Sequence, residues 1–137
     1  MLKDTSMLTE AQLIDTEWQE NGIILHNCSG VITIEDLART LLTDLKDSRY
    51  ATTTASLWDL RGVRSTVNQY DLNYYARYFL DLMALVPKTR RTAWVVKLKM
   101  SEAIINSYYR EHPWPATWRT FNHRTPAEQW CAKARPD

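Results

Sequence analysis

Hydrophobic and polar positions alternate with a period of two near the start of the chain. Residues 13–18 follow this alternation, and Asn21 and Gly22 after them tolerate the positive φ angles of a tight turn. Residues 22–27 then form a second apolar segment of strand length. The pattern predicts an N-terminal β-hairpin.

The period changes to that of a helix after the hairpin. Between residues 34 and 45, apolar residues recur at intervals of three and four, which is typical of one face of an amphipathic helix. Thr33 is the expected N-cap, and Asp36 stands three residues later, in the capping-box position. The apolar stripe consists of Ile34, Leu37, Ala38, Leu41, Leu42 and Leu45.

Three more strands and three more helices are predicted downstream. The β-branched and apolar residues of 52–60 lack clean alternation, as expected of a central strand covered on both faces. Pro87 ends the helical pattern that follows this strand. The predicted strands are residues 52–60, 92–98 and 116–121, and the predicted helices are residues 67–85, 101–109 and the segment that begins near Thr125.

The segment from Thr125 to Glu128 is the strongest local helix signal in the chain. Thr125 is a preferred N-cap residue, Pro126 fits the first helical position, and Glu128 would complete a capping box. We therefore expect the last helix to begin with Thr125 as its cap.

Strands that alternate with helices in this way predict an α/β fold. We expect a mixed sheet of about five strands with right-handed crossovers and about four helices packed mainly on one face. Residues 54–60 should lie inside the sheet, with an arginine-bearing bend at its rim. No repeat or linker divides the chain, so residues 1–137 form one domain with a core over about 13–134.

The composition is that of an ordinary soluble protein. Hydrophobic residues make up 45% and charged residues 24% of the chain, and no apolar run approaches the roughly 20 residues that span a bilayer. The N-terminus lacks a secretory signal, so we expect a cytoplasmic protein. Cys28 and Cys131 lie far apart without a CxxC motif, and we expect free, buried thiols.

Chemical motifs are scarce. The histidines lack metal-ligand spacing, and phosphate-binding and hydrolase motifs are absent. His26 and Cys28 would share one face of a strand, but the sequence offers neither a third group to orient them nor an oxyanion hole. We therefore expect no catalytic residue, no metal and no cofactor. Acidic residues exceed basic ones by ten to four over residues 1–60, and basic residues exceed acidic ones by thirteen to six over residues 61–137.

Three segments resemble a known family. GVITIEDL at residues 30–37, LWDLRGV at 57–63 and FNHRTPAEQW at 121–130 resemble, in the same order, conserved stretches of STAS domains and of their SpoIIAA-like relatives, many of them uncharacterised bacterial proteins. The resemblance covers about residues 13–134. It implies that Asp59 ends the central strand and that Gly62 permits the turn out of it.

The resemblance also bears on regulation by phosphorylation. Phosphoswitch members of that family carry a helix-capping serine, a few residues after this strand, that accepts phosphate from a kinase. Val67, Asn68 and Gln69 stand at the matching positions, so the usual acceptor is missing. Ser65 or Thr66 lies two to three residues early and would serve only if the loop is shortened.

A charged segment follows the central strand. The start of the next helix would offer free backbone N–H groups, and Arg61 and Arg64 beside it would favour an anion such as phosphate. Alternatively, Thr66 or Asn68 is an ordinary cap, the arginines are solvated or paired with Asp59 and Asp71, and no ligand binds. The candidate binding residues are Asp59, Arg61, Arg64, Ser65 and Thr66.

Tyrosines widen the apolar surface of the predicted helix at residues 67–85. Tyr70, Tyr74 and Tyr78 recur every four residues, beside the apolar stripe. Such a surface is either additional core or a contact with a partner or an apolar ligand. A pocket between this helix and the sheet would be lined by Trp58, Tyr75 and Arg61.

These features predict a non-catalytic regulatory or protein-interaction module. Its contacts would come from residues 61–69 and the aromatic helix, and its partner would be another protein or a second copy of the chain, as in a homodimer. The alternative is a protein that binds a small apolar or anionic ligand in the pocket. A net charge of +1 argues against nucleic acid, and we expect no membrane insertion.

Overall fold

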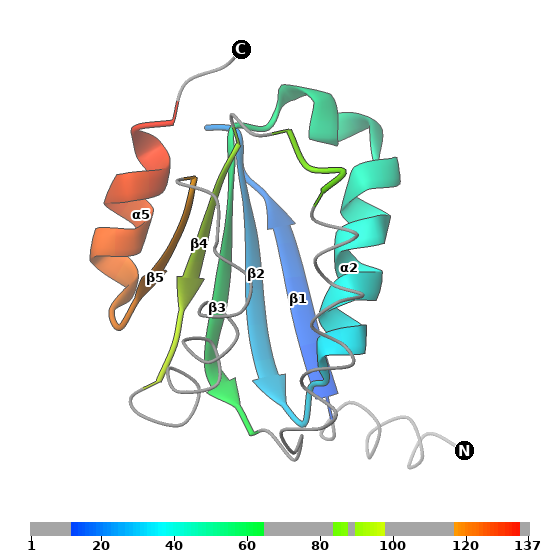
Figure 1. Ribbon diagram of the computed structural model, residues 1–137, viewed down its shortest axis with the longest axis vertical. Helices are drawn as coiled ribbons and strands as arrows, with labels where there is room; N and C mark the ends of the chain where they lie inside the picture. The colour runs from blue at the N-terminus through cyan, green and yellow to red at the C-terminus, as the bar shows by residue number, and fades with distance from the viewer. Residues whose placement is uncertain (1–11, 65–83, 88–89, 98–116, 135–137) are drawn as a thin grey trace.

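The N-terminal hairpin forms as predicted. The computed structural model describes residues 12–64, 84–87, 90–97 and 117–134, and begins with β1 (Gln12–Trp18) and β2 (Ile23–Gly30), which pair antiparallel (Figure 1). The Gly22 N–H donates to the Gln19 carbonyl oxygen at 3.1 Å, and Gly22 has a φ of 86°. A glycine at positive φ thus closes the short loop, as in three-residue hairpins.

Five strands form one sheet in the order β1-β2-β3-β4-β5. β3 (Ala55–Val63), β4 (Arg91–Val95) and β5 (Trp118–Phe121) each run parallel to the preceding strand, so among the described strands the hairpin alone is antiparallel. The mixed five-stranded sheet is confirmed, and the segment predicted to be central, β3, lies in its middle.

Gly62 has a different role from the one that the resemblance implied. β3 continues past Asp59 to Val63, so Asp59 does not end the strand and Arg61 lies within it rather than in a bend. Gly62 pairs with Ser29 next to an irregularity in β2, where a Cβ on Gly62 would lie 3.0 Å from the carbonyl oxygen of Cys28. Glycine is therefore needed here for close approach of two strands, not for a turn.

α2 (Ile34–Lys46) connects β2 to β3 through the short 3-10 helix η1 (Ser48–Thr52). Its predicted capping box is confirmed: the Asp36 N–H donates to Thr33 Oγ1 at 3.1 Å, and the Thr33 N–H donates to Asp36 Oδ2 at 2.9 Å. The shorter aspartate thus satisfies the same two donors as the glutamate that usually stands there.

The last helix, α5 (Arg124–Ala132), begins before the predicted cap. His123 is its N-cap and makes no side-chain capping hydrogen bond, so Thr125 lies inside the first turn and the predicted capping box is wrong. Pro126 is tolerated there because the first N–H groups of a helix have no partner within it. The side chain of Arg124, the first residue of α5, attaches this end of the helix to Asn27 of β2 and Asp59 of β3.

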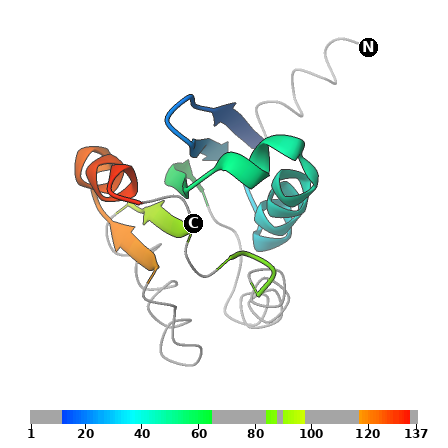
Figure 2. The same cartoon turned by 90° about the horizontal axis from the view of Figure 1, so that it is seen from above.

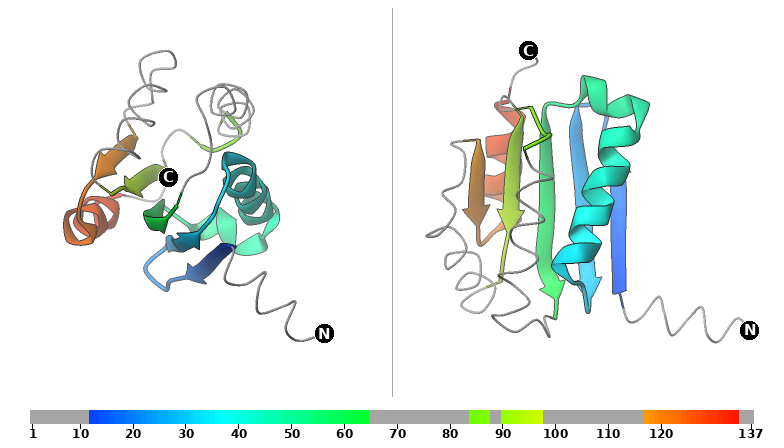
Figure 3. Two further views of the ribbon diagram at one scale, coloured as in Figure 1. Left: turned by 90° about the horizontal axis from the view of Figure 1, so that it is seen from below. Right: turned by 45° about the vertical axis from the view of Figure 1, so that its right-hand side comes forward.

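The two described α-helices, α2 and α5, cover opposite faces of the sheet (Figures 2 and 3). α2 packs on one face with the core of Cys28, Trp58 and Trp94, and α5 packs on the other with the core of Leu25, Leu57 and Val95. The helices expected over 67–85 and 101–109 lie almost entirely outside the described residues, so packing mainly on one face stays a prediction. Within the described ranges no helix is long and apolar enough to cross a membrane.

Candidate functional site

Asp59 is a buried carboxylate on the α5 face of the sheet. It pairs with Asn27 of β2 on one side and Val95 of β4 on the other, close to the carboxyl end of β3, and it is only 6% exposed. A buried carboxylate requires partners that replace the lost water.

Arg61 supplies most of the hydrogen bonds that replace water around the Asp59 carboxylate. Its Nε donates to Asp59 Oδ1 at 2.9 Å and its Nη2 to Oδ2 at 2.8 Å, and its backbone N–H also donates to Oδ1 at 3.2 Å. Two parallel hydrogen bonds fix the guanidinium plane. The Arg61 side chain is nevertheless 41% exposed, so it presents a positive charge to solvent in a fixed orientation.

Arg124 links this pair to a second strand and to α5. Its Nη1 donates to Asn27 Oδ1 at 2.8 Å and lies 3.5 Å from Asp59 Oδ2, and its Nε donates to Glu128 Oε2 at 3.2 Å. We call Asn27, Asp59, Arg61 and Arg124 the carboxyl-end cluster. It joins β2, β3 and the start of α5.

The contacts with Arg61 and Arg124 determine the protonation state of Asp59. Burial alone would raise the pKa of Asp59, but hydrogen bonds and charge from Arg61, with a smaller contribution from Arg124, lower that pKa overall. Asp59 is therefore ionised at neutral pH and cannot donate a proton.

The structure brings only part of the predicted site together. Arg64 is exposed just beyond β3, where its backbone N–H donates to the Gly30 carbonyl oxygen at 2.8 Å. Trp58 is buried on the α2 face, opposite the Asp59–Arg61 pair. Ser65, Thr66 and the tyrosines Tyr70, Tyr74, Tyr75 and Tyr78 lie outside the described residues.

A second polar group is buried in the core around His26, and its partners were not predicted from the sequence. His26 is fully buried, with Nδ1 2.8 Å from Thr16 Oγ1 of β1 and Nε2 2.7 Å from Asp44 Oδ2 of α2. Asp44 orients the His26 ring, and it is the third group that was not found from the sequence. The sequence feature that could have indicated its burial is its position three residues after Leu41, on the apolar side of the helix.

Aromatic rings continue from His26 across the α2 face of the sheet. The ring centroids of His26 and Trp58 are 3.9 Å apart, those of Trp58 and Trp94 5.3 Å, and those of Trp94 and Trp118 6.0 Å. The strand register produces this row, since Trp58 pairs with both His26 and Trp94. The imidazole is thus enclosed by an indole, a carboxylate and a hydroxyl.

Both cysteines are free and buried, as predicted. Burial, with a further contribution from the charge of Asp59, raises the pKa of Cys28 to about 12, and burial likewise raises the pKa of Cys131 to about 12. Neither thiol forms a thiolate at neutral pH, so neither is an activated nucleophile. No cluster of three potential metal-ligating side chains occurs in the part of the chain that the structure describes.

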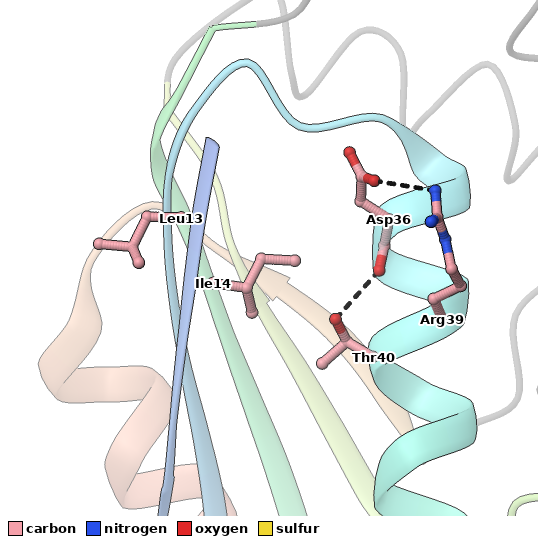
Figure 4. A pocket seen from close by; sticks show the side chains of 5 residues that line it. All are labelled: Leu13, Ile14, Asp36, Arg39 and Thr40. Atoms are coloured by element: carbon pink, nitrogen blue, oxygen red, sulfur yellow. Dashed lines mark hydrogen bonds and ion pairs between the residues drawn. The ribbon is translucent and has the colours of Figure 1, made fainter. Parts of the chain in front are cut away.

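A shallow groove lies between the edge strand β1 and the first half of α2 (Figure 4). It has a volume of about 290 Å³ and lies on the α2 side, away from the carboxyl-end cluster. Its lining residues are Leu13, Ile14, Asp36, Arg39 and Thr40.

Comparison with known proteins identifies the fold. No family model and no curated protein matches the chain. An anti-sigma factor antagonist from Mycobacterium paratuberculosis matches with a TM-score of 0.59 at 13% sequence identity, over 88% of this chain and 93% of that chain. An uncharacterized protein of the DUF3478 family with a SpoIIAA-like fold, from Shewanella loihica, matches with a TM-score of 0.54 at 18% identity, over the same fractions. The chain therefore has the SpoIIAA-like fold that the resemblance implied.

Proposed function

We propose that this protein is a non-catalytic regulatory module that binds another protein through the carboxyl-end cluster. The observation that carries the proposal is the Asp59–Arg61 pair: two hydrogen bonds fix a guanidinium that stays 41% exposed. Arginine held in this way loses little conformational entropy on binding and is enriched in protein interfaces.

The chemistry of the described residues supports binding rather than catalysis. Asp59 is held ionised by two arginines, and the thiols of Cys28 and Cys131 are protonated and buried. His26 is surrounded by Thr16, Asp44 and Trp58 and has no exposed surface. Each of these groups is thus engaged within the fold.

The fold supports a role of the same kind. One structural neighbour is an anti-sigma factor antagonist, and regulation through contact with another protein is what we propose here. By the resemblance, Val67, Asn68 and Gln69 stand where phosphoswitch members carry the acceptor serine, so the module that we propose does not use a phosphorylation switch at those positions.

The partner surface should be acidic. Arg61 and Arg64 are both exposed at the rim of the sheet, and binding to carboxylates would extend the ion-pair network that begins at Asp59. Such binding should weaken as salt concentration rises, because exposed charge pairs are screened.

A charge reversal at Arg61 tests the proposal, and Arg49 offers a matched control. Arg49 contacts Asp47, two residues earlier, through the same three hydrogen bonds, but it lies in η1, before the amino end of β3. Arg61→Glu and Arg49→Glu therefore change the same charge in the same local motif at opposite ends of the sheet.

The experiment compares affinity capture by the two variants and the wild type from a lysate of the producing cells, with quantitative mass spectrometry. We expect wild type and Arg49→Glu to retain the same stoichiometric protein, and Arg61→Glu to lose at least about 90% of it. Equal capture by all three proteins would refute the proposed surface. Sedimentation velocity of the purified proteins shows whether that partner is a second copy.

Binding of a small ligand between residues 67–85 and the sheet stays a prediction, since most of that segment lies outside the described residues. Native mass spectrometry of the purified wild type and of Arg61→Ala tests it. A bound small molecule that the variant loses would favour ligand binding over the proposed module.

A further inference from the structure

β1 offers an open edge of the sheet. One side of β1 pairs with β2, and no described strand pairs with its other side. The Gln19 N–H donates to the Ile23 carbonyl oxygen at 3.0 Å, so these two residues form a hydrogen-bonded pair. In an antiparallel ladder such pairs alternate with pairs whose backbone groups point away from the partner strand. The backbone groups of Ile14, Thr16 and Trp18 therefore point toward the open edge.

One face of this edge strand is acidic. Leu13, Asp15 and Glu17 alternate along β1 on the face opposite α2, and all three are exposed. Neither carboxylate has an ion pair among the described residues; Glu17 accepts one hydrogen bond, from Gln19 Nε2 at 3.2 Å. α5 packs over β3, β4 and β5, so it leaves this face uncovered.

The groove runs beside the same edge on the α2 side. Figure 4 shows Ile14 pointing toward α2 and Leu13 pointing away from it. Asp36 and Thr40 line the opposite wall, where the Thr40 hydroxyl donates to the Asp36 carbonyl oxygen at 3.0 Å. An added strand would therefore find an acidic surface on one side and a small, partly apolar groove on the other.

We propose that an extended segment of a partner protein, with basic residues at alternate positions, adds to β1 as a sixth strand. Its basic side chains face Asp15 and Glu17, and its intervening small or apolar side chains enter the groove beside Ile14. Antiparallel self-pairing of β1 centred on Asp15 would place two aspartates opposite each other, and self-pairing centred on Thr16 would place Asp15 opposite Glu17, so a basic segment complements this acidic face better than a second copy does. The proposal concerns a different surface from the carboxyl-end cluster.

A synthetic peptide tests the proposal with the intact protein. The probe is an eight-residue peptide that alternates lysine with valine or threonine, and its control has the same composition with the lysines grouped together. We expect the alternating peptide to slow amide hydrogen exchange at Ile14, Thr16 and Trp18, measured by NMR, and to leave exchange at Leu13, Asp15 and Glu17 unchanged. No added protection at the first three amides, or equal binding of both peptides, would overturn the proposal.

Variants separate strand addition from general charge attraction. Asp15→Lys reverses a charge on the strand, and Glu20→Lys makes the same change in the exposed turn beside it. We expect Asp15→Lys to weaken binding of the alternating peptide at least about fivefold, and Glu20→Lys less than about twofold, by fluorescence anisotropy. Equal weakening by both variants would contradict the proposed register. Concentration-dependent dimerisation that the peptide competes away would instead assign the edge to a second copy.

Discussion

Two aspartates in this chain make the same arginine contact in different surroundings. Asp47 and Asp59 each accept three hydrogen bonds from the arginine two residues later. The hydrogen bonds from Arg49 lower the pKa of Asp47 to about 2, and the pKa of Asp59 is also lowered although its burial acts in the other direction. The contact is set locally by sequence, and the neighbouring strands decide whether it is buried.

Asp59 should contribute to stability only while it is ionised. Because its pKa is lower in the folded than in the unfolded state, its contribution is present above the unfolded value of about 3.9 and is lost as pH falls through the folded value. We expect Asp59→Asn to reduce the free energy of unfolding by about 1–3 kcal/mol at pH 7, and by less at pH 3. Urea titrations from pH 7 to pH 2.5 measure both effects.

Asp47→Asn is the control for this pH dependence. It removes the same local contact at an exposed site, where solvent screens the charges. Its effect at pH 7 should be smaller than that of Asp59→Asn. A constant difference between wild type and Asp59→Asn across the whole pH range would contradict the assigned ion pairs.

A side chain at Gly62 should destabilise the fold. A Cβ there would lie 3.0 Å from the Cys28 carbonyl oxygen and 3.1 Å from Ser29 Cβ, and β2 and β3 would have to separate. We expect Gly62→Ala to cost about 1–3 kcal/mol in urea unfolding, although alanine favours a strand more than glycine does. A stabilised Gly62→Ala would show that the strands relax freely at this position.

Single residues were predictable from sequence where their partners are local. The capping pair Thr33 and Asp36 was predicted because both partners lie within one helical turn. The start of α5 was not, because Arg124 is held by Asn27, which is distant in sequence. The role of Gly62 also depends on a neighbouring strand.

At the scale of elements, α2 is attached to the sheet by one buried polar contact in an apolar interface. Leu37, Ala38 and Leu41 pack on the sheet, and Asp44 binds His26 at 2.7 Å near the end of the helix. This contact joins α2 to β2, and Thr16 extends it to β1. The contact therefore fixes the position of the helix along the strands.

Removal of one partner of this contact should be more costly than removal of both. Asp44→Leu leaves Nε2 of buried His26 without its hydrogen-bond partner, and we expect a loss of about 3 kcal/mol. His26→Phe with Asp44→Leu replaces both groups by apolar ones, and its loss should be smaller than the sum of the two single losses by at least about 1 kcal/mol. Urea unfolding of the three variants gives the coupling energy, and additive losses would refute it.

The first strand of the hairpin and α2 were predictable because their periods of two and 3.6 are visible in short windows, and β3 was predictable because it is rich in β-branched and apolar residues. The row of His26, Trp58, Trp94 and Trp118 was not, because it exists only in the register of four strands. The same limit applies to the carboxyl-end cluster. Asp59 and Arg61 were identified as a charged segment, but Asn27 and Arg124 were not.

At the scale of the whole molecule, one sheet separates two cores. Leu41 belongs to the core under α2, and Cys131 to the core under α5. The sheet lies between α2 and α5, the helices that carry these two residues (Figure 3). Changes in one core should therefore leave packing in the other unaltered.

Paired substitutions test this separation. We expect Leu41→Ala to cost about 2–5 kcal/mol and Cys131→Ala about 1 kcal/mol, and their losses to add within about 0.5 kcal/mol. Chemical denaturation of the single and double variants measures the sum. As a control, Leu41→Ala with Ile32→Val changes two residues within one core and is expected to deviate from additivity.

The order of strands in the sheet has a consequence for biosynthesis. Strands that are neighbours in the sheet are consecutive along the chain, from β1 to β5. Each described strand that leaves the ribosome therefore meets an edge that has already formed, and none of these five must insert between two earlier ones. Assembly of this domain can keep pace with translation, beginning at the hairpin and ending when α5 covers the second face.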